Sequence, residues 1–357
     1  MKGVRGMAAT IIDIAELAGT SKSTVSRYLT GGTVKKKTAA SIEAAIESLQ
    51  YAPNINARRL VQAKTNVIGV VFDDISMYFY AEIMQGIQDV ANQNQYVCNF
   101  FSRANCNRRE SDFLSLFAQG QVDGIVFATF RQRDAQDIAA IAATGLPVVL
   151  LGSRADHSGV SHVDVDNRLG ISELVSYLHS LGHRRIAYLN GPEVMPAALS
   201  RLEGYRQGLA NCGLPYRKSL VADVPWSVEG GRAAVEELAA RGEPYTALIG
   251  SNEFCAFGAA RTLQAAGLGV PENVSVAGFD DSPLLQYASP CITTLRQPFL
   301  QMGQMAVRQL MGRLRDPLAT PASIYLQPRL MVRDSCARAR EEAPEATGGT
   351  MEGGAAC

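Results

Sequence analysis

The sequence predicts two structural units, an N-terminal all-α head and a two-lobed α/β body with parallel sheets. Between positions 10 and 49, apolar residues recur at helical spacing. After Asn66, strand-like runs alternate with helical stretches about every 25 to 30 residues. The charge is also uneven. The first 66 residues hold ten lysines and arginines against four acidic residues, a net charge of +6, although the whole chain is neutral. A basic head on an acidic body is typical of a protein that binds a polyanion.

Length and composition exclude several classes of protein. A chain of 357 residues that is 47% hydrophobic can bury a large core in two or three domains. No apolar run reaches the roughly 18 residues of a membrane span, and the first ten residues lack the apolar region of a secretory signal. The seven cysteines form no C-x-x-C pair. We therefore predict free thiols in the reducing cytoplasm, without disulfides or a structural zinc.

The head is predicted to contain three short helices. A Thr10–Asp13 capping box begins the first helix, and Gly19 ends it. Either Thr20 or Ser21 caps a second helix that runs to Leu29. The apolar positions of the first and third helices are Ile11, Ile14, Ala15, Ala18, Ile42, Ala45, Ile46 and Leu49. A tight turn after the first of three short helices is typical of a helix-turn-helix unit.

The second helix has one polar, basic side. Lys22, Ser23, Ser26 and Arg27 share this side, whereas Val25 lies opposite. Lysine and arginine can donate hydrogen bonds to guanine O6 and N7, and serine can bond bases or phosphate. This pattern predicts a DNA recognition helix. The alternative is the solvated face of a small helical cap.

A second short basic segment, "YAPNINARRL", follows the head. Pro53 precedes a helical run of seven or eight residues that ends near Leu60. A helix of this length is only marginally stable by itself in water. We expect it to fold when a DNA minor groove holds it. Leu60 is then either a wedge between base steps or a contact onto the body.

The body shows the pattern of βαβ units. Runs such as "GIVFATF" and "PVVLLG" are apolar throughout, as expected for parallel strands that are covered on both faces. The sequence contains no phosphate-binding G-x-x-x-x-G-K-[ST] loop and no nucleophile elbow. We read His183 in "GHRRIA" as part of a helix-to-strand turn, because no metal-ligand partner lies at i+4. We therefore predict no enzyme activity, no catalytic or metal-binding residues and no cofactor.

Several ordered blocks resemble the lactose/galactose repressor family of bacterial transcription regulators. They begin with "TIIDIAELAGTSKSTVSRYL", "YAPNINARRL" and "TNVIGVV" and continue through "FYAEIMQGIQDVA", "QVDGIVF", "DVDNRLG", "LGHRRIAYLNGP", "SRLEGYRQGL", "SVAGFDD" and "TTLRQP". The resemblance extends from about Ala9 to Asp334. It implies a homodimeric repressor that binds a palindromic operator and carries an effector-binding body of the periplasmic-binding-protein type.

The resemblance also implies the domain boundaries. A disordered N-terminus covers 1–8, the helix-turn-helix domain 9–52, a hinge helix with its linker 53–66, the body 67–335 and a disordered tail 336–357. Lobe 1 takes about 67–163 and 296–322, and lobe 2 about 164–295 and 324–335. The last strand of lobe 2 is placed near Ile324 to Val332. The chain crosses between the lobes three times, and the ligand lies at the carboxyl ends of the strands.

The matched positions supply two sets of expected contacts. Those to DNA are Thr10, Ser21, Lys22, Ser23, Thr24, Ser26, Arg27, Asn54, Ala57, Arg58 and Leu60. Those to the effector are Phe79, Tyr80, Arg201, Trp226, Asn252 and Asp280. A carboxylate and a guanidinium can each bond adjacent hydroxyls, and an indole covers the apolar face of a pyranose, so this set suits a sugar. The chain departs from the family pattern at Thr20, at Ala128 and in "LGSR", and the last two changes leave the ligand's identity open.

The leading hypothesis is a cytoplasmic, nucleoid-associated repressor whose operator affinity is set by a small effector, most simply a sugar. A purine-like corepressor or a phosphorylated partner protein is an alternative trigger. A sugar-binding transport protein is a further alternative, although the basic head and the missing signal sequence argue against it. The tail from residue 336 has no apolar heptads, so we expect a dimer without a tetramerising zipper.

Overall fold

The computed structural model describes residues 9–29, 32–51, 64–104, 110–131, 133, 135–153 and 159–340. The chain divides into two compact units, a head within Met1–Thr65 and a body within Asn66–Cys357. The predicted disordered N-terminus 1–8 lies outside the described residues, as do the predicted hinge contacts Asn54, Ala57, Arg58 and Leu60.

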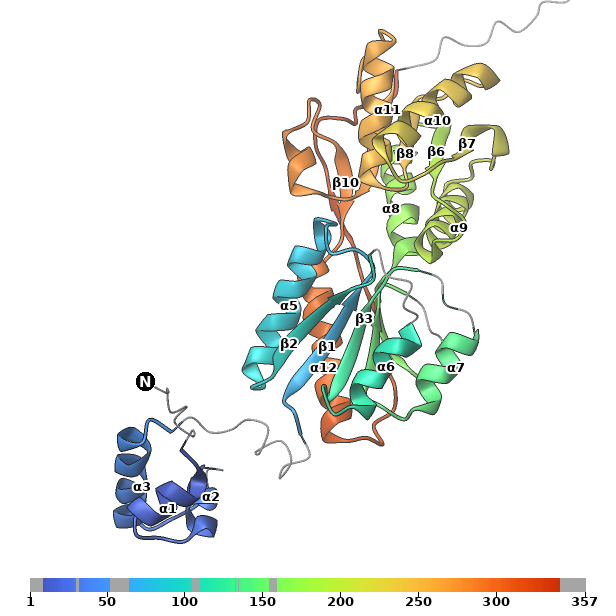
Figure 1. Cartoon of the computed structure of the whole chain (residues 1–357). Helices are drawn as coiled ribbons and strands as arrows, with labels where there is room; N and C mark the ends of the chain where they lie inside the picture. The colour runs from blue at the N-terminus through green and yellow to red at the C-terminus, as the bar shows by residue number, and fades with distance from the viewer. Residues whose placement is uncertain are drawn as a thin grey trace, which may run out of the picture. The chain divides into compact units, whose positions relative to one another are not determined.

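The head contains three helices, α1 (Ile11–Leu17), α2 (Lys22–Leu29) and α3 (Lys36–Ser48), drawn in blue in Figure 1. The predicted capping box begins α1. The backbone N–H of Thr10 donates to the Asp13 carboxylate at 2.7 Å, and the Asp13 N–H donates back to the Thr10 hydroxyl at 3.4 Å. Gly19, with φ of +60°, ends the helix. Ser21 begins α2, because its hydroxyl accepts the N–H of Thr24 at 3.2 Å.

A small apolar core holds these helices together. Ile14 of α1, Val25 of α2 and Ile42 of α3 are each 0% exposed. Tyr28 adds a link between α2 and α3 by donating a hydrogen bond to the Glu43 carboxylate. Because the buried side of α2 faces this core, its polar side remains on the surface of the head.

The body contains two six-stranded sheets, which we name sheet A and sheet B. The strand order is β11-β5-β4-β3-β1-β2 in sheet A and β12-β10-β9-β8-β6-β7 in sheet B. Sheet A is made of β1 (Val67–Phe72), β2 (Val97–Ser102), β3 (Gly124–Ala128), β4 (Val148–Leu151), β5 (Ser161–Val165) and β11 (Ser323–Leu326). Sheet B is made of β6 (Ile186–Asn190), β7 (Val221–Asp223), β8 (Ala247–Gly250), β9 (Ser275–Asp280), β10 (Thr293–Arg296) and β12 (Arg329–Met331). All neighbouring strands are parallel except β10 and β12.

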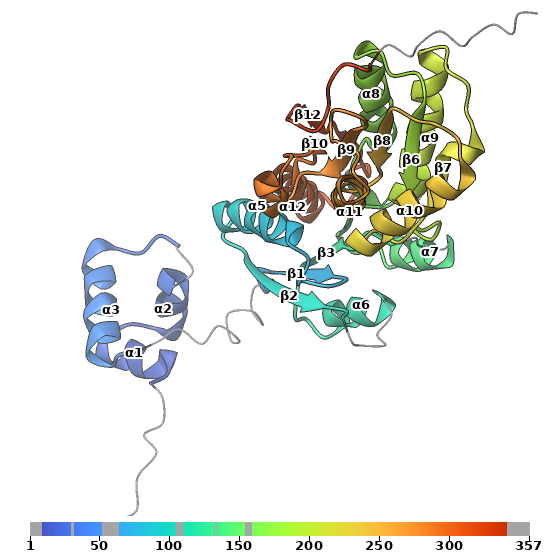
Figure 2. The same cartoon turned by 90° about the horizontal axis from the view of Figure 1, so that it is seen from above.

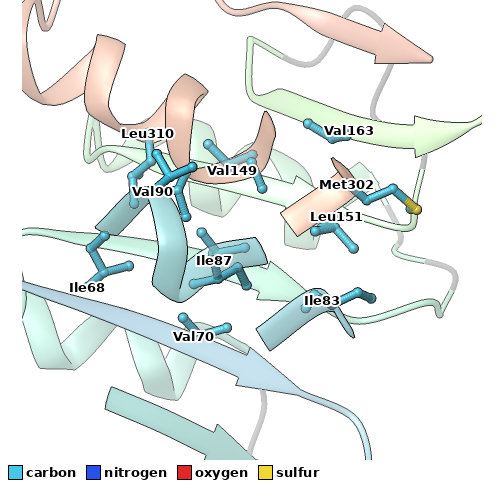
Figure 3. Close-up of a cluster of buried hydrophobic side chains, with 14 of the residues drawn as sticks. Ile68, Val70, Ile83, Ile87, Val90, Val149, Leu151, Val163, Met302 and Leu310 are labelled. Carbon is cyan, nitrogen blue, oxygen red and sulfur yellow. The ribbon is translucent and has the colours of Figure 1, made fainter. Parts of the chain in front are cut away.

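Helices cover both faces of sheet A and form lobe 1 with it. On one face, α5 (Phe79–Gln93) and α12 (Phe299–Arg315) pack on alternate residues of β1, as Figure 3 shows for Ile68 and Val70. On the other face, α6 (Glu110–Ala118) and α7 (Ala135–Ala143) cover Val71. Burial on both faces explains why the strands read as continuous apolar runs.

Sheet B forms lobe 2 in the same way. Helices α8 (Asn167–Ser180) and α9 (Pro196–Asn211) cover one face, and α10 (Val228–Arg241) and α11 (Glu253–Ala265) cover the other. Short 3-10 turns, η1 (Lys218–Leu220) and η2 (Pro283–Tyr287), precede β7 and follow β9. The two lobes lie end to end in Figure 1, and Figure 2 shows the same body from above.

The chain passes from one sheet to the other after β5, after β10 and after β11. The expectation of a single last strand in lobe 2, near Ile324 to Val332, is wrong. This segment is two strands, because β11 pairs with β5 of sheet A and β12 pairs with β10 of sheet B. Pro328 lies between them, packed near Gly170, and lacks the N–H that a continuous ladder requires.

The expectation that the disordered tail starts at residue 336 is wrong for its first five residues. Within 336–340, the Ala337 N–H donates to the Ser275 hydroxyl at 3.0 Å and the Ala339 N–H donates to the Leu181 carbonyl at 2.9 Å. These bonds tie the segment to lobe 2, and residues 341–357 lie outside the described part. Across the described ranges, no helix has the length and apolar character needed to cross a bilayer.

Candidate functional site

The exposed side of α2 carries the basic residues that the sequence places there. Lys22, Ser23 and Arg27 are exposed, and Ser26 is half-buried. Val25, on the opposite side, is completely buried in the core of the head. The helix therefore presents two cations and two hydroxyls on one surface, which can donate hydrogen bonds to base edges and phosphates.

Three further hydroxyls that the sequence assigned to DNA also hold the ends of the head's helices. The Ser21 hydroxyl lies 2.8 Å from both the Ser23 and the Thr24 hydroxyls. At the start of α1, the Thr10 hydroxyl donates to Asp13 at 2.8 Å. The hydrogen bond from the Thr10 backbone lowers the pKa of Asp13 most, and the one from the Thr10 hydroxyl lowers it further. These hydroxyls lie at helix N-termini, where backbone N–H groups favour an anion.

In the body, Arg201 is the centre of a buried polar network at the carboxyl ends of the strands of sheet B. The side chain is 3% exposed and comes from α9. Its Nε donates to Asn167 Oδ1 at 2.7 Å, and its Nη1 donates to the Ser251 carbonyl at 2.5 Å. Its Nη2 pairs with Asp280 Oδ1 at 3.2 Å. The guanidinium is thus fixed in orientation by three different elements of lobe 2.

Asp280 is the carboxylate of this network. It follows the buried part of β9 with φ of +103°, and its Oδ1 also accepts the amide N–H of Gln297 at 2.5 Å. The next residue, Asp281, is neutralised separately by Arg296 at 2.5 Å and Arg333 at 2.6 Å. One member of the "GFDD" pair therefore faces Arg201, and the other is a structural ion-pair partner.

Trp226 borders the same network. Its indole N–H donates to the Ser251 hydroxyl at 2.7 Å, and the ring lies so close to Gly191 that any Cβ there would overlap it. The Arg201 guanidinium carbon lies 5.1 Å from the centre of the Trp226 ring and 3.7 Å from that of Phe279. Lobe 2 thus brings together a cation and a carboxylate, which can bond hydroxyls, and an indole, which can cover an apolar ligand face.

The other expected effector contacts differ in their surroundings. Asn252 is 5% exposed and caps α11, because its Oδ1 accepts the Cys255 N–H at 2.9 Å. Phe79 is half-buried at the start of α5, whereas Tyr80 is 2% exposed and packs on Phe72 in the core of lobe 1. The aromatic pair is therefore divided between a partly accessible ring and a core ring that supports it.

An aromatic cluster in lobe 1 lies beside Ala128 and the "LGSR" segment, where the sequence departs from the family pattern. The ring of Phe130 lies over Gly152, which has φ of +78°, and leaves no room for a side chain at that position. Phe130 also contacts Phe79 edge-to-face, with ring centres 5.2 Å apart, and Phe79 stacks on Phe299 at 5.1 Å. With Ala128 completely buried nearby on β3, this part of lobe 1 is mainly apolar.

A cavity of about 220 Å³ lies beside Asn167, where the chain crosses from β5 to α8. Residues of both lobes line it, including Tyr325 of β11 and Ser200 of α9. Because Asn167 also accepts the hydrogen bond from Arg201 Nε, this cavity adjoins the Arg201 network.

Sequence reasoning missed several members of this network. Asn167 and Gln297 lie inside two stretches that the sequence singled out, "DVDNRLG" and "TTLRQP", and Ser251 directly follows the apolar strand β8. A polar residue at the end of an apolar strand was the available signal. The described residues contain no group of three metal-ligating side chains. His183 contacts the Thr246 and Ser275 hydroxyls at 2.9 and 3.1 Å.

Comparisons with known proteins agree with both units. Residues 10–54 match the model "Bacterial regulatory proteins, lacI family", and residues 175–336 match "Periplasmic binding protein-like domain". The chain is 31% identical over 332 residues to the HTH-type transcriptional regulator DegA of Bacillus subtilis (strain 168), covering 92% of this chain and 98% of DegA.

Two solved structures extend this likeness. The lac repressor dimer bound to operator and the anti-inducer ONPF has a TM-score of 0.80 at 27% identity, covering 93% of this chain and 100% of that chain. The CelR–cellobiose complex has a TM-score of 0.68 at 31% identity, covering 92% of this chain and 99% of that chain. These relatives are transcription regulators and not enzymes, as expected for this chain. The chain therefore belongs to the LacI family of bacterial regulatory proteins and is a DNA-binding transcription regulator.

Proposed function

We propose that the protein is a repressor whose affinity for operator DNA is controlled by a small, uncharged sugar bound between the lobes of its body. The observation that carries the proposal is the buried Arg201–Asp280 pair beside Trp226. All three guanidinium nitrogens of Arg201 donate to acceptors within the protein. Arg201 is therefore better placed to orient Asp280 toward sugar hydroxyls than to neutralise an anionic ligand.

In this proposal, the homodimer binds a palindromic operator in the cytoplasm. Lys22, Ser23, Ser26 and Arg27 of α2 read bases in the major groove, and the helix-end hydroxyls contact phosphates. The likeness to a lac repressor dimer that was solved on its operator supports this arrangement. The structure of CelR with cellobiose supports a sugar as the effector class.

A planar nucleobase is the second candidate effector. The cluster of Phe79, Phe130 and Phe299 favours it, because aromatic rings stack on flat bases as well as on sugar faces. The polar network of lobe 2 would then bond the edge of the base. The first experiment therefore has to compare both ligand classes directly.

A thermal-shift screen with glucose, galactose, cellobiose, adenine and glucose 6-phosphate tests the proposal. A neutral sugar at 100 times its Kd should stabilise the protein by about 2.7 kcal/mol. Arg201→Ala should abolish this response because Asp280 loses its orienting partner. Arg206→Ala on the same helix is the matched control, since its exposed guanidinium lies over Tyr216 at 5.0 Å. A response to adenine or to the phosphate alone would contradict the neutral-sugar proposal.

A further inference from the structure

The C-terminal end of the described chain crosses the edge of sheet B where its parallel strands begin. Residues 335–339, which we name the strap, come after β12, and Figure 2 shows this part in dark red, running toward α8. Ser335 is 0% exposed. Its carbonyl accepts the Val276 N–H of β9 at 2.8 Å, and its hydroxyl accepts the Thr293 N–H of β10 at 2.7 Å. The strap therefore satisfies backbone donors at the start of both strands.

His183 lies under the middle of the strap and is 2% exposed. Its Nε2 is 3.1 Å from the Ala337 carbonyl oxygen and 3.1 Å from the Ser275 hydroxyl, and its Nδ1 is 2.9 Å from the Thr246 hydroxyl. A carbonyl oxygen can only accept, so Nε2 carries the ring proton and Nδ1 accepts the hydrogen of the Thr246 hydroxyl. The imidazole is thus held as one neutral tautomer.

The surroundings of His183 do not favour a positive charge. The atoms that face the ring belong to Thr246, Ser275 and Ala337, none of which titrates. Burial lowers the pKa of His183, and the Ala337 hydrogen bond, which opposes this effect, is the smaller cause. No charged side chain of the described residues changes this pKa, although the segments that meet there carry Arg184, Arg185, Glu243, Glu272, Asp334 and Arg338. A protonated imidazole is therefore more stable where water reaches it than under the strap.

We propose that the strap is a pH-sensitive latch, which detaches from lobe 2 when His183 takes up a second ring proton. Once the strap is released, water reaches the imidazole, which then has its ordinary pKa of 6.5. The attached state binds fewer protons than the released state, so the strap is held firmly above pH 6.5 and is progressively weakened as the pH falls. Between pH 7.5 and pH 5 the ratio of released to attached strap should rise by as much as about 30-fold. Release frees the N–H groups at the start of β9, the strand that ends at Asp280.

Two cysteines of lobe 2 allow the release to be measured on the full-length protein. Cys336 belongs to the strap, where its thiol donates to the Val276 carbonyl at 3.3 Å and burial raises its pKa to about 11. Cys255 is 0% exposed in the core beside α10 and reports on unfolding of the lobe. The thiols are labelled with 4,4′-dithiodipyridine at pH 7.5 and pH 5, and each is followed by peptide mass spectrometry. Each rate is divided by that of the same thiol in the urea-unfolded protein at the same pH, which removes the intrinsic pH dependence of the reagent.

We expect the relative labelling rate of Cys336 to rise by up to about 30-fold at pH 5, while that of Cys255 stays unchanged. His183→Gln cannot be protonated, so its Cys336 rates should be equal at the two pH values even if the glutamine holds the strap less tightly. His179→Gln, in the last turn of α8, is the matched control and should keep the wild-type pH response.

Three outcomes would overturn the latch. The first is a relative rate of Cys336 in the wild type that does not depend on pH. The second is a pH response that His183→Gln retains, because another group would then cause it. The third is an equal acceleration of Cys336 and Cys255, which would mean that lobe 2 opens as a whole.

Discussion

Individual side chains in this protein are assigned different tasks by how deeply they are buried. Arg27 is exposed on the surface of α2, whereas Arg201 is 3% exposed and held by three acceptors. Removing one partner of a buried ion pair leaves an uncompensated charge, which is why Arg201→Ala should affect the whole network. Removing an exposed arginine should chiefly lower the affinity for the partner that it contacts.

Arg27 gives the prediction at the residue scale. If Arg27 reads a base, Arg27→Ala should lose roughly 1–3 kcal/mol of operator affinity and relax the preference at one base position. Lys36→Ala, at an exposed lysine in the first turn of α3, should weaken all sequences alike and reduce the salt slope by about one unit. Binding to an operator library at several salt concentrations separates the two effects. Unchanged sequence discrimination by Arg27→Ala would show that Arg27 does not read bases.

At the scale of elements, the packing of α5 on α12 determines the shape of lobe 1. These helices are far apart in sequence, yet they touch backbone to backbone at glycines. A Cβ added to Gly86 would overlap the Leu300 carbonyl of α12, and one added to Gly303 would overlap the Ile83 carbonyl of α5. The close approach brings the start of α12, with Phe299, to the aromatic cluster around Phe79.

We therefore expect Gly86→Ala to destabilise the body by about 1–3 kcal/mol, because backbone atoms cannot move aside as a flexible side chain can. Gly312→Ala on α12 is the matched control. An added Cβ there meets no atom within 4 Å, and replacing a helical glycine by alanine stabilises by about 0.5–1 kcal/mol. Urea unfolding of both variants measures the difference. Equal effects of the two substitutions would show that this helix contact is not tight.

At the scale of the whole molecule, the proposed effector site and the proposed DNA surface belong to different compact units. Any influence of one on the other is a coupling free energy, which thermodynamics makes reciprocal. A ligand site with partners in both lobes is suited to such coupling. A ligand there distinguishes between lobe arrangements by its affinity for each.

The prediction at this scale is reciprocity. If a sugar lowers operator affinity by some factor, typically 5- to 150-fold, saturating operator should lower sugar affinity by the same factor. Calorimetry of the sugar with and without operator, compared with operator titrations with and without sugar, measures both. If sugar changes operator affinity but operator leaves sugar affinity unchanged, the two sets of measurements do not report the same pair of linked binding equilibria.

Local patterns in the sequence were sufficient for most of the fold. The Thr10–Asp13 capping box and the single apolar side of α2 are set by neighbours three or four residues apart, so they can be read from the chain. The uniformly apolar β3 and β4 likewise indicated parallel strands covered on both faces. The blocks of family resemblance correctly indicated a helix-turn-helix domain followed by a periplasmic-binding-protein-like domain.

The tertiary structure decided which polar residues meet. Arg201 and Asp280 are 79 positions apart, and neither residue's neighbours show that Asn167, Ser251 and Gln297 would join them. The division of the last segment between the two sheets and the meeting of Tyr78 with Phe254 also depend on contacts distant in sequence. The physical reason is that helix and strand patterns arise from local backbone geometry, whereas a buried polar network depends on which strand ends and helix ends the packed lobes bring together.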